Sequence, residues 1–363
     1  MKIVYDARHI ENPYSGLGRY TSSLLDGLIK CGQLFTELII ILNKNTSYYN
    51  NPHFELINYL KKDKRCSVLY VDAPLFGLKH HFNISRIVNT IKPDLYFYPH
   101  FDVPIFINMP TKFVVHDLLP LIVINYIIKF KYIKKIYFHT LILFSLHRRT
   151  NRCIAVSETT KKDIIKFFGI KYSDKIQVVF EAPFETFWEN KSSNEITKPF
   201  LFYVGDRRPH KNLKKMIDVF LILKSKYHYI GEFIIAGNKK NFGLNIDNYT
   251  KDVADIRFLG SIDDEELNRY YQTMDSLFFI STYEGFGLPI LEAAKHNKKI
   301  ITSNTSSMSE IAPNSALFVN PHDDDLNYLA CEINNYILRP LKIDNSEYLK
   351  KFSWVRTAKE IFS

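Results

Sequence analysis

The sequence predicts an α/β protein built from two doubly wound domains, each a parallel sheet wrapped by helices. The chain has 363 residues, and at about 150 residues per domain this length suggests two domains. Short apolar runs alternate with longer stretches of helical periodicity, which is the βαβ pattern of a parallel sheet. The alternation pauses once, over a polar stretch that ends near residue 199, and then resumes. We therefore expect two Rossmann-like halves facing a central cleft.

The first half contains buried strands and amphipathic helices in alternation. Strands are expected over residues 2–5, 38–42, 68–71, 95–98, 112–115, 153–156 and 177–180. A helix is expected over residues 18–31, because Leu24, Leu25 and Leu28 share one face. A second helix is expected over residues 159–168, where Ser157 can cap the first turn.

The second half repeats the pattern after a linker. Residues 181–199 hold two prolines and a polar run without clear period, which is typical of an interdomain linker. Strands are then expected over residues 200–204, 232–236, 256–259, 276–280, 299–302 and 316–319, and helices over 213–226, 264–274 and 288–296.

Composition and charge narrow the classes of function. Hydrophobic residues make up 46% and charged residues 24%, which excludes a disordered chain. The net charge of +10 favours an anionic partner: a nucleotide, a nucleic acid or an acidic membrane surface. The four cysteines form no CxxC pair, so neither a zinc site nor a disulfide framework is expected. The sequence contains no signal peptide and no apolar run of about 20 residues, so we expect a cytoplasmic protein.

The sharpest local motif is YEGFGLPILE, residues 283–292, which directly follows an expected buried strand. Its glycines allow a tight turn, and Pro289 suits the start of a helix whose amides can bind an anion. Glu284 in the turn and Glu292 in the helix can accept hydrogen bonds from sugar or ribose hydroxyls. The alternative interpretation is a glycine turn with two solvated glutamates.

A second motif, GDRRPHKNL at residues 205–213, follows the first strand of the second half. Lysine and arginine beside a helix start suit a diphosphate, whose charge must be neutralised when it departs as a leaving group. The alternative interpretation is a solvated basic loop.

Two motifs of the first half carry weaker signals. SGLGRYT, residues 15–21, resembles GxGxxG but ends in Thr21, so we expect a flexible glycine loop over the cleft, formed by Gly16 and Gly18. His116 and Asp117 follow a buried strand, where the imidazole can donate to a reacting sugar or acid group. A lone His-Asp pair is more often a hydrogen-bonded structural feature.

Five motifs occur in one order along the chain: SGLGRYTSSLL, IAVSETTKKDI, YVGDRRPHKNL, EGFGLPILE and SNTSSMSEIA. Together they resemble the retaining glycosyltransferases of family 4, which have the GT-B fold, over Met1 to about residue 330. The resemblance implies an acceptor-side domain over residues 1–182, a linker over 183–199 and a nucleotide-sugar-binding domain over 200–345. A C-terminal helix over residues 346–363 would pack back on the first domain.

The resemblance implies how the donor is bound. Glu292 would bind the nucleotide ribose, and Glu284 would contact the donor sugar. Backbone amides of Phe286, Gly287 and Leu288 would hold the hydroxyls or phosphate of the donor.

The resemblance also implies which residues act at the reacting bond. Lys211 corresponds to the lysine that neutralises the donor diphosphate, and Gly16 to the loop glycine beside it. His116 corresponds to a histidine near the transferred sugar, and Gly18 and Asp117 are expected to bind substrate as well. No metal or cofactor is implied, because basic side chains and helix dipoles replace the metal.

Some positions depart from the family pattern. Asp206 stands where many members have an arginine, and of the next two residues we favour Arg207 over Arg208 as the phosphate ligand. Glu181 and Ala182 replace the usual Asn-Gly after the last strand of the first half.

The resemblance further implies transfer of a hexose from a nucleotide-diphosphate sugar, with GDP-mannose favoured and a UDP-sugar as the alternative. The GxGRY loop paired with SSMxE looks most like mannosyltransferases of bacterial surface-polysaccharide assembly, which act on a glycan or lipid-linked acceptor. The implied mechanism retains the anomeric configuration by front-face attack, and a departing diphosphate oxygen helps to deprotonate the acceptor hydroxyl.

Residues 129–152 combine lysines and arginines with aromatic side chains. This composition suggests peripheral contact with an anionic membrane that carries a lipid-linked acceptor. The alternative is an ordinary helix with a solvated basic face.

Two other functions compete with this interpretation. Nucleotide-sugar 2-epimerases share the architecture, but they are not expected to carry EX7E within a GFGLP turn. A nucleic-acid-binding protein would fit the basic charge, yet the sequence contains no RRM, KH or helix-turn-helix pattern. We therefore expect no nucleic acid partner.

Overall fold

The computed structural model describes residues 1–12, 15–44, 54–122, 131–184, 198–238, 246, 250 and 253–363. The chain divides into two compact units: residues 1–182 together with 352–363 form the first, and residues 183–351 form the second. Most of the linker that the sequence predicts over residues 183–199 lies outside the described residues.

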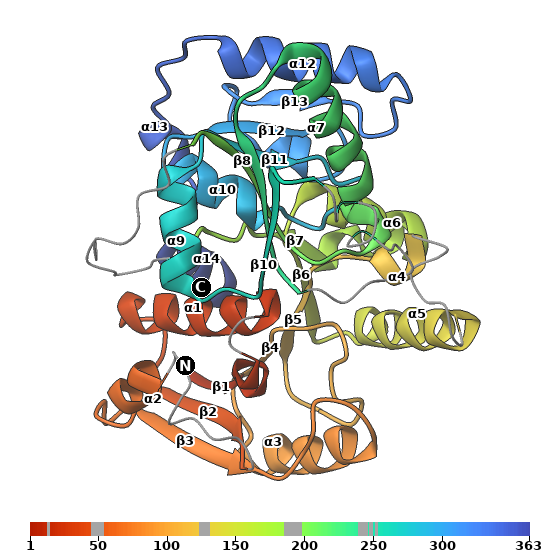
Figure 1. Cartoon of the computed structure of the whole chain (residues 1–363). Coiled ribbons are helices and arrows are strands. Elements are labelled where there is room, and N and C mark those ends of the chain that lie inside the picture. Colours follow the sequence, from red (N-terminus) through yellow and green to blue (C-terminus); the bar gives the residue numbers. More distant parts are fainter. Residues whose placement is uncertain are drawn as a thin grey trace. The chain divides into compact units, whose positions relative to one another are not determined.

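The first unit contains, among its described residues, a parallel sheet of seven strands (Figure 1). In order across the sheet these are β3 (Cys66–Val71), β2 (Glu37–Asn43), β1 (Lys2–Asp6), β4 (Leu95–Tyr98), β5 (Thr111–Val115), β6 (Asn151–Ala155) and β7 (Ile176–Val178). The strand order reverses between β1 and β4, which pair directly. Ligands of open α/β sheets bind beyond the carboxyl ends of the strands at such a switch point. The strands predicted for this half are confirmed to within two residues at each end.

The helices of the first unit come from both ends of the chain. They are α1 (Gly16–Cys31), α2 (Phe54–Leu60), α3 (Ser85–Ile91), α4 (Leu119–Ile122), α5 (Lys131–His147), α6 (Glu158–Phe168) and α14 (Trp354–Phe362), with the short turns η1 (Arg8–Glu11), η2 (His80–Ile84) and η3 (Ile170–Lys175). As predicted, the Ser157 hydroxyl caps α6 by accepting from the amide of Thr160 at 3.0 Å. Helix α14 packs on α1 so closely that a Cβ at Gly27 would lie 2.4 Å from the carbonyl oxygen of Trp354. Only glycine fits at that crossing.

The second unit contains, within the described part of the chain, a parallel sheet of six strands. In order these are β10 (Ile256–Gly260), β9 (Glu232–Ala236), β8 (Phe200–Val204), β11 (Ser276–Phe279), β12 (Lys299–Ser303) and β13 (Leu317–Val319). The order reverses between β8 and β11, so their carboxyl ends form the switch point of this sheet. The predicted strands are confirmed to within one residue at each end, because strands buried on both faces are continuous apolar runs.

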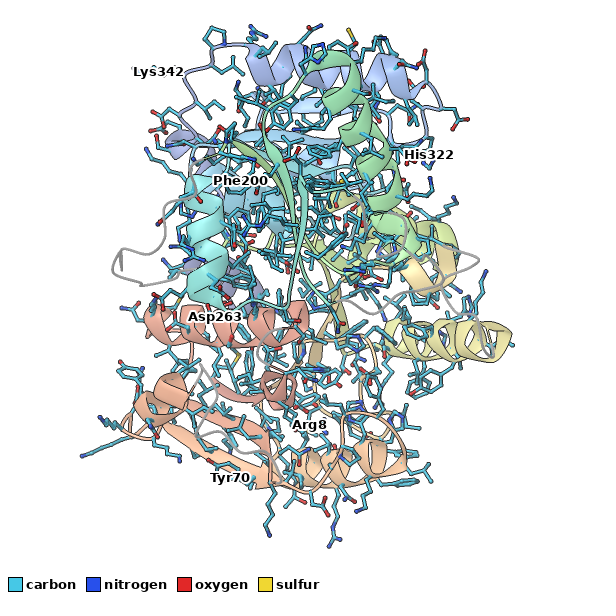
Figure 2. All side chains as sticks on the ribbon, in the orientation of Figure 1. Arg8, Tyr70, Phe200, Asp263, His322 and Lys342 are labelled. Carbon is cyan, nitrogen blue, oxygen red and sulfur yellow. The ribbon has the colours of Figure 1, made fainter. Side chains whose placement is uncertain are left out.

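The helical segments of the second unit are η4 (Pro209–Lys211), α7 (Leu213–Tyr227), α9 (Asp264–Thr273), α10 (Leu288–Lys295), α11 (Met308–Ile311), α12 (Leu326–Leu338) and α13 (Ser346–Leu349). Asp263 caps α9 by accepting from the amide of Glu266, and the residue is labelled in Figure 2. Helix α12, which the sequence analysis did not predict, packs on α7.

The helix predicted over residues 346–363 is not continuous. It is replaced by α13, which belongs to the second unit, and α14, which belongs to the first. The interruption has a local cause, because Ser353 has an extended backbone (φ −148°, ψ 132°) and α14 begins after it. Among the described residues, none of the helices combines the length and the apolar character needed to cross a lipid bilayer.

Candidate active site

The carboxyl ends of β8 and β11 bring the two sharpest sequence motifs together. The strands pair in parallel, and the loops after them contain residues 205–212 and 280–287. The amide of Thr282 donates to the carbonyl of His210 at 2.7 Å, and the Thr282 hydroxyl donates to the same oxygen at 3.2 Å. Both motifs therefore lie at one edge of one sheet, joined to each other.

Lys211 and Glu284 form an ion pair at this edge. Lys211 Nζ lies 2.7 Å from Oε1 and 2.9 Å from Oε2 of Glu284, and each side chain is 13% exposed. The ammonium group also lies 5.5 Å from the centre of the Phe279 ring. A shielded ammonium at a strand end can neutralise an anionic ligand, and a carboxylate beside it can accept hydrogen bonds from hydroxyls. The sequence analysis placed both residues in the site but did not predict that they pair.

Two serine hydroxyls hold the loop that carries Glu284. Ser306 Oγ donates to the carbonyl of Glu284 at 2.6 Å and accepts from its amide at 3.2 Å. Ser307 Oγ is hydrogen-bonded to the carbonyls of Glu284 (3.0 Å) and buried Phe286 (2.6 Å). The SNTSSMSEIA motif signalled this segment, but sequence reasoning gave the two serines no role. These hydrogen bonds to backbone atoms fix the path of the Glu284 loop.

Helix α10 begins where the Glu284 loop ends. Its N-cap is Gly287, whose φ of 114° is in the region that favours glycine. As a glycine, Gly287 has no side chain with which to cap this helix end. Pro289 has no amide hydrogen and the amide of Ile290 donates to Gly287, so the amide of Leu288 and the helix dipole are what favour an anion here. Glu292, the fifth residue of the helix, is half-buried.

The two arginines after β8 have different surroundings. Arg208 Nε donates to Asp206 Oδ2 at 2.5 Å, and the Arg208 side chain is 28% exposed. Arg207 is only 2% exposed, and its guanidinium carbon lies 4.6 Å from the centre of the Phe258 ring. Arg208 is therefore more exposed to solvent than Arg207, the arginine that the sequence analysis favours as the phosphate ligand.

His210 adds no positive charge to these loops. Burial, with the nearby charges of Lys211 and Arg208, lowers the pKa of His210 to about 2. The imidazole is therefore neutral, and the positive charge of this edge comes from the lysine and arginine side chains.

In the first unit, both ring nitrogens of His116 have partners from that unit. Nδ1 lies 3.0 Å from Glu181 Oε1, and Nε2 donates to the carbonyl of Pro99 at 2.9 Å. Burial by itself lowers the pKa of His116, but the hydrogen bond and charge of Glu181 and the Pro99 carbonyl raise it above its ordinary value. The glutamate that replaces the family's usual Asn-Gly thus has a partner. The Tyr20 ring packs edge-on against His116, with centres 4.6 Å apart.

The helix predicted over residues 18–31 is confirmed and begins two residues earlier, at Gly16. The predicted glycine loop is wrong, because Gly16 and Gly18 both lie in the first turn of α1. Ser15 Oγ caps this helix by accepting from the amide of Gly18 at 3.0 Å. Serine is a typical N-cap residue, but the neighbouring glycines suggested a loop instead. A Cβ at Gly18 would lie 2.1 Å from the carbonyl oxygen of Asn12, so glycine is needed there for packing. Asp117 Oδ1 accepts from the amide of Leu119 at 2.9 Å, just where α4 begins.

Comparison with known proteins defines the class. Residues 185–339 match the protein family described as Glycosyl transferases group 1, and this region contains Lys211, Glu284 and Glu292. The chain is a glycosyltransferase of the GT-B fold, as the sequence resemblance implied. Glycosyltransferases of this group use nucleotide-sugar donors, so the substrates are a nucleotide sugar and a glycan acceptor.

Individual relatives give the comparison more detail. The chain is 24% identical over 392 residues to O-antigen chain mannosyltransferase B of Escherichia coli, and the match covers 98% of this chain and 96% of that protein. It is 28% identical over 228 residues to O-antigen chain mannosyltransferase RfbU of Salmonella typhimurium, over 62% of this chain and 60% of that protein. Among solved structures, the apo form of the lipopolysaccharide outer core galactosyltransferase WaaB has a TM-score of 0.66 at 16% identity, over 99% of this chain and 97% of that chain. This last similarity concerns the fold.

Proposed function

We propose that this protein is a retaining mannosyltransferase that moves mannose from GDP-mannose to a glycan or lipid-linked acceptor in O-antigen or capsule-type polysaccharide synthesis. The observation that carries the donor side of the proposal is the Lys211–Glu284 pair at the β8/β11 switch point, beside the start of α10. Both O-antigen mannosyltransferases described above support mannose as the sugar. A UDP-sugar is the alternative donor.

The second unit would hold the donor. Lys211 and an adjacent arginine, either Arg207 or Arg208, neutralise the diphosphate as it leaves. Glu284 turns from Lys211 to the sugar hydroxyls once the diphosphate takes its place beside the ammonium. The amides at the start of α10, from Phe286 to Leu288, bind the phosphate or sugar, and Glu292 accepts from the ribose hydroxyls.

The first unit would supply the acceptor side. His116, held by Glu181 and by the Pro99 carbonyl, would act near the transferred sugar, as the family resemblance implies, and Asp117 orders the adjoining turn. The acceptor hydroxyl attacks the anomeric carbon from the side that the diphosphate leaves. Its proton passes to the departing diphosphate oxygen, so no protein nucleophile is needed. The basic and aromatic composition of residues 129–152 supports contact of this unit with an anionic membrane that carries the acceptor; residues 123–130 lie outside the described part.

A donor screen tests the proposal directly. The purified protein is incubated with GDP-mannose and with UDP-sugars, each with and without glycan acceptors. Mass spectrometry identifies the products, and the one-bond C1–H1 coupling measured by NMR gives their anomeric configuration. We expect release of GDP and a product heavier by one hexose whose anomeric configuration is retained. Turnover of UDP-sugars alone would reject the mannose assignment, and an inverted product would reject the mechanism.

The Lys211→Ala variant tests the donor residues. Without the ammonium, the leaving diphosphate is poorly neutralised, and kcat/KM should fall by about 10²–10³-fold, as when one stabilising donor is removed. Lys214→Ala is the matched control, because Lys214 is on the exposed side of α7 and pairs with Asp218 at 2.8 Å. Circular dichroism checks that both variants fold. Activity of Lys211→Ala within twofold of wild type contradicts the proposed role.

A further inference from the structure

A second cluster of polar side chains lies at the switch point of the first sheet, outside every motif used above. His9 follows β1, while His100 and Asp102 follow β4, the neighbour of β1 in the sheet. Arg8, which precedes His9, marks this place in Figure 2. Because ligands of open α/β sheets bind at such carboxyl ends, the cluster occupies in the first sheet the place that the lysine–glutamate pair has in the second.

Three possible ligand atoms converge in this cluster. One ring nitrogen each from His9 and His100 and one carboxylate oxygen of Asp102 all lie within 4.8 Å of one another. Ligand atoms bound to one zinc ion at about 2.0–2.2 Å stand roughly 3.3–3.6 Å apart, so small side-chain movements suffice. His9 and Asp102 are buried, whereas the His100 side chain is 18% exposed, which gives an ion a route from solvent.

The carboxylate of Asp102 is buried with few donors. Its Oδ1 accepts from His100 Nδ1, but its Oδ2 has no hydrogen-bond partner among the described residues. His80 Nε2 is 4.0 Å from this oxygen and donates instead to the backbone carbonyl of Asp102 at 2.7 Å. The guanidinium of Arg8, which is hydrogen-bonded to His80 Nδ1 at 3.0 Å, is bound by Asp6 at 2.8 Å. A buried carboxylate is costly unless a cation or several donors compensate its charge.

We propose that His9, His100 and Asp102 bind one divalent transition-metal ion of the zinc type. Two imidazoles and one carboxylate are a common ligand set for zinc, with water in the fourth position. The ion gives Asp102 its missing positive partner and joins the loops that follow β1 and β4. This site belongs to the first unit and is independent of the proposed donor residues, all of which lie in the second unit.

Zinc binding by the full chain tests the proposal. The protein is purified without a histidine tag, stripped with EDTA and titrated with Zn²⁺ by calorimetry, and Co²⁺ is added separately to record its visible spectrum. We expect one equivalent of Zn²⁺ and a Co²⁺ spectrum typical of four ligands. In His100→Ala and Asp102→Asn the affinity should fall by at least about tenfold, and thermal unfolding without metal checks that both variants fold.

His322→Ala is the matched control, because His322 is an exposed histidine of the second unit, labelled in Figure 2. Stoichiometric binding that this control keeps and that both cluster variants lose supports the site. The absence of binding by the wild-type chain, or equal binding by His100→Ala, overturns it and leaves the cluster as a hydrogen-bonded network only.

Discussion

Two Asp-x-Arg segments, one at the carboxyl end of β1 and one at that of β8, have similar local geometry in different surroundings. In the first unit, Arg8 donates from Nε and Nη2 to the two carboxylate oxygens of Asp6, both at 2.8 Å. In the second, Arg208 donates to Asp206 from Nε at 2.5 Å and from its amide at 3.1 Å. The first pair is fully buried, whereas the side chains of the second are 28% and 25% exposed. The two-residue spacing allows the arginine and the aspartate to pair, and the burial of the pair decides whether a ligand can reach it.

Within the first unit the buried pair is enclosed by further hydrogen bonds. Arg8 Nη1 donates to the carbonyl of Ala73 at 2.9 Å, and the Tyr96 hydroxyl donates to Asp6 Oδ2 at 2.8 Å. Burial by itself lowers the pKa of Arg8, but the charge of Asp6 outweighs it, so the pKa is raised. This pair joins strand ends, whereas its counterpart in the second unit is accessible to a ligand from solvent.

The largest effect is expected from Arg8→Met, which removes the buried Asp6–Arg8 pair of the first unit. Loss of the guanidinium leaves Asp6 as a buried charge without its partner, which costs about 3–5 kcal/mol of unfolding free energy. Urea unfolding followed by circular dichroism should show the transition of the first unit at a lower denaturant concentration.

The control for this variant is Arg65→Met. Arg65 donates from Nε to Asp63 Oδ1 at 3.2 Å and from Nη2 to Oδ2 at 2.7 Å, with the same spacing in the sequence but in an exposed turn. Its unfolding midpoint should match the wild type, because solvent replaces the pair. Equal midpoints for Arg8→Met and Arg65→Met would show that burial is not what separates these pairs.

A smaller effect is expected from Ser307→Ala, which tests whether the Glu284 loop of the second unit must be held in place for ligand binding. The carbonyls of Glu284 and Phe286 lose a donor, and a buried group without a partner costs about 1–3 kcal/mol. We expect the KM for the nucleotide sugar to rise about 5–30-fold, with a smaller change in kcat. Ser307→Thr should restore the KM because it keeps the hydroxyl, and Ser309→Ala, in an exposed position of the same segment, should not change it. A wild-type KM for Ser307→Ala would mean that the hydroxyl does not position the loop.

The smallest effect is expected from Glu181→Gln, which tests whether the first unit holds a charged histidine. Without the carboxylate the pKa of His116 should fall, although Asp117, Tyr20 and His9 remain around it. Because the pKa of His116 is raised in the folded state, its contribution to stability is present below the ordinary value of about 6.5 and is lost as the pH rises through the folded value.

The measurement for this variant is the free energy of unfolding against pH, together with an NMR titration of His116. The difference in the free energy of unfolding between wild type and Glu181→Gln should be larger near pH 6 than near pH 9. It should shrink over the pH range in which His116 loses its proton. Glu37→Gln is the control and should show no such trend, because Glu37 is exposed, with its Oε2 3.3 Å from Lys2 Nζ. A difference that does not vary with pH would mean that Glu181 does not stabilise the imidazolium.

Much of this architecture could be predicted from the sequence, because buried parallel strands are continuous apolar runs whose ends carry polar loops. Lys211 and Glu284 follow such strands, so the motifs alone placed them at one edge of one sheet. The pairing of their charges could not be predicted, since it depends on η4 and on the loop held by Ser306 and Ser307.

Other features depend on contacts that sequence spacing does not contain. His9 and His100 are far apart in the sequence and meet because β1 and β4 are neighbours in the sheet. The sequence predicts a helix from residue 18 but also a glycine loop at Gly16 and Gly18. The Ser15 cap and the close approach of Asn12 show that the helix already includes both glycines. Glu181 was recognised as a departure from the family pattern, but its partner His116 is known only from the fold.

The position of α14 has a consequence for biosynthesis. The first unit is completed by residues 352–363, which are translated only after residues 183–351 have been made. At about 5–20 residues per second, roughly 15 to 65 seconds pass between the synthesis of Gly27 in α1 and that of Trp354, which packs on it. Throughout that interval the nascent chain exposes apolar side chains of α1 that chaperones can bind, so a chain truncated at residue 351, whose first unit lacks α14, should aggregate more than the full chain.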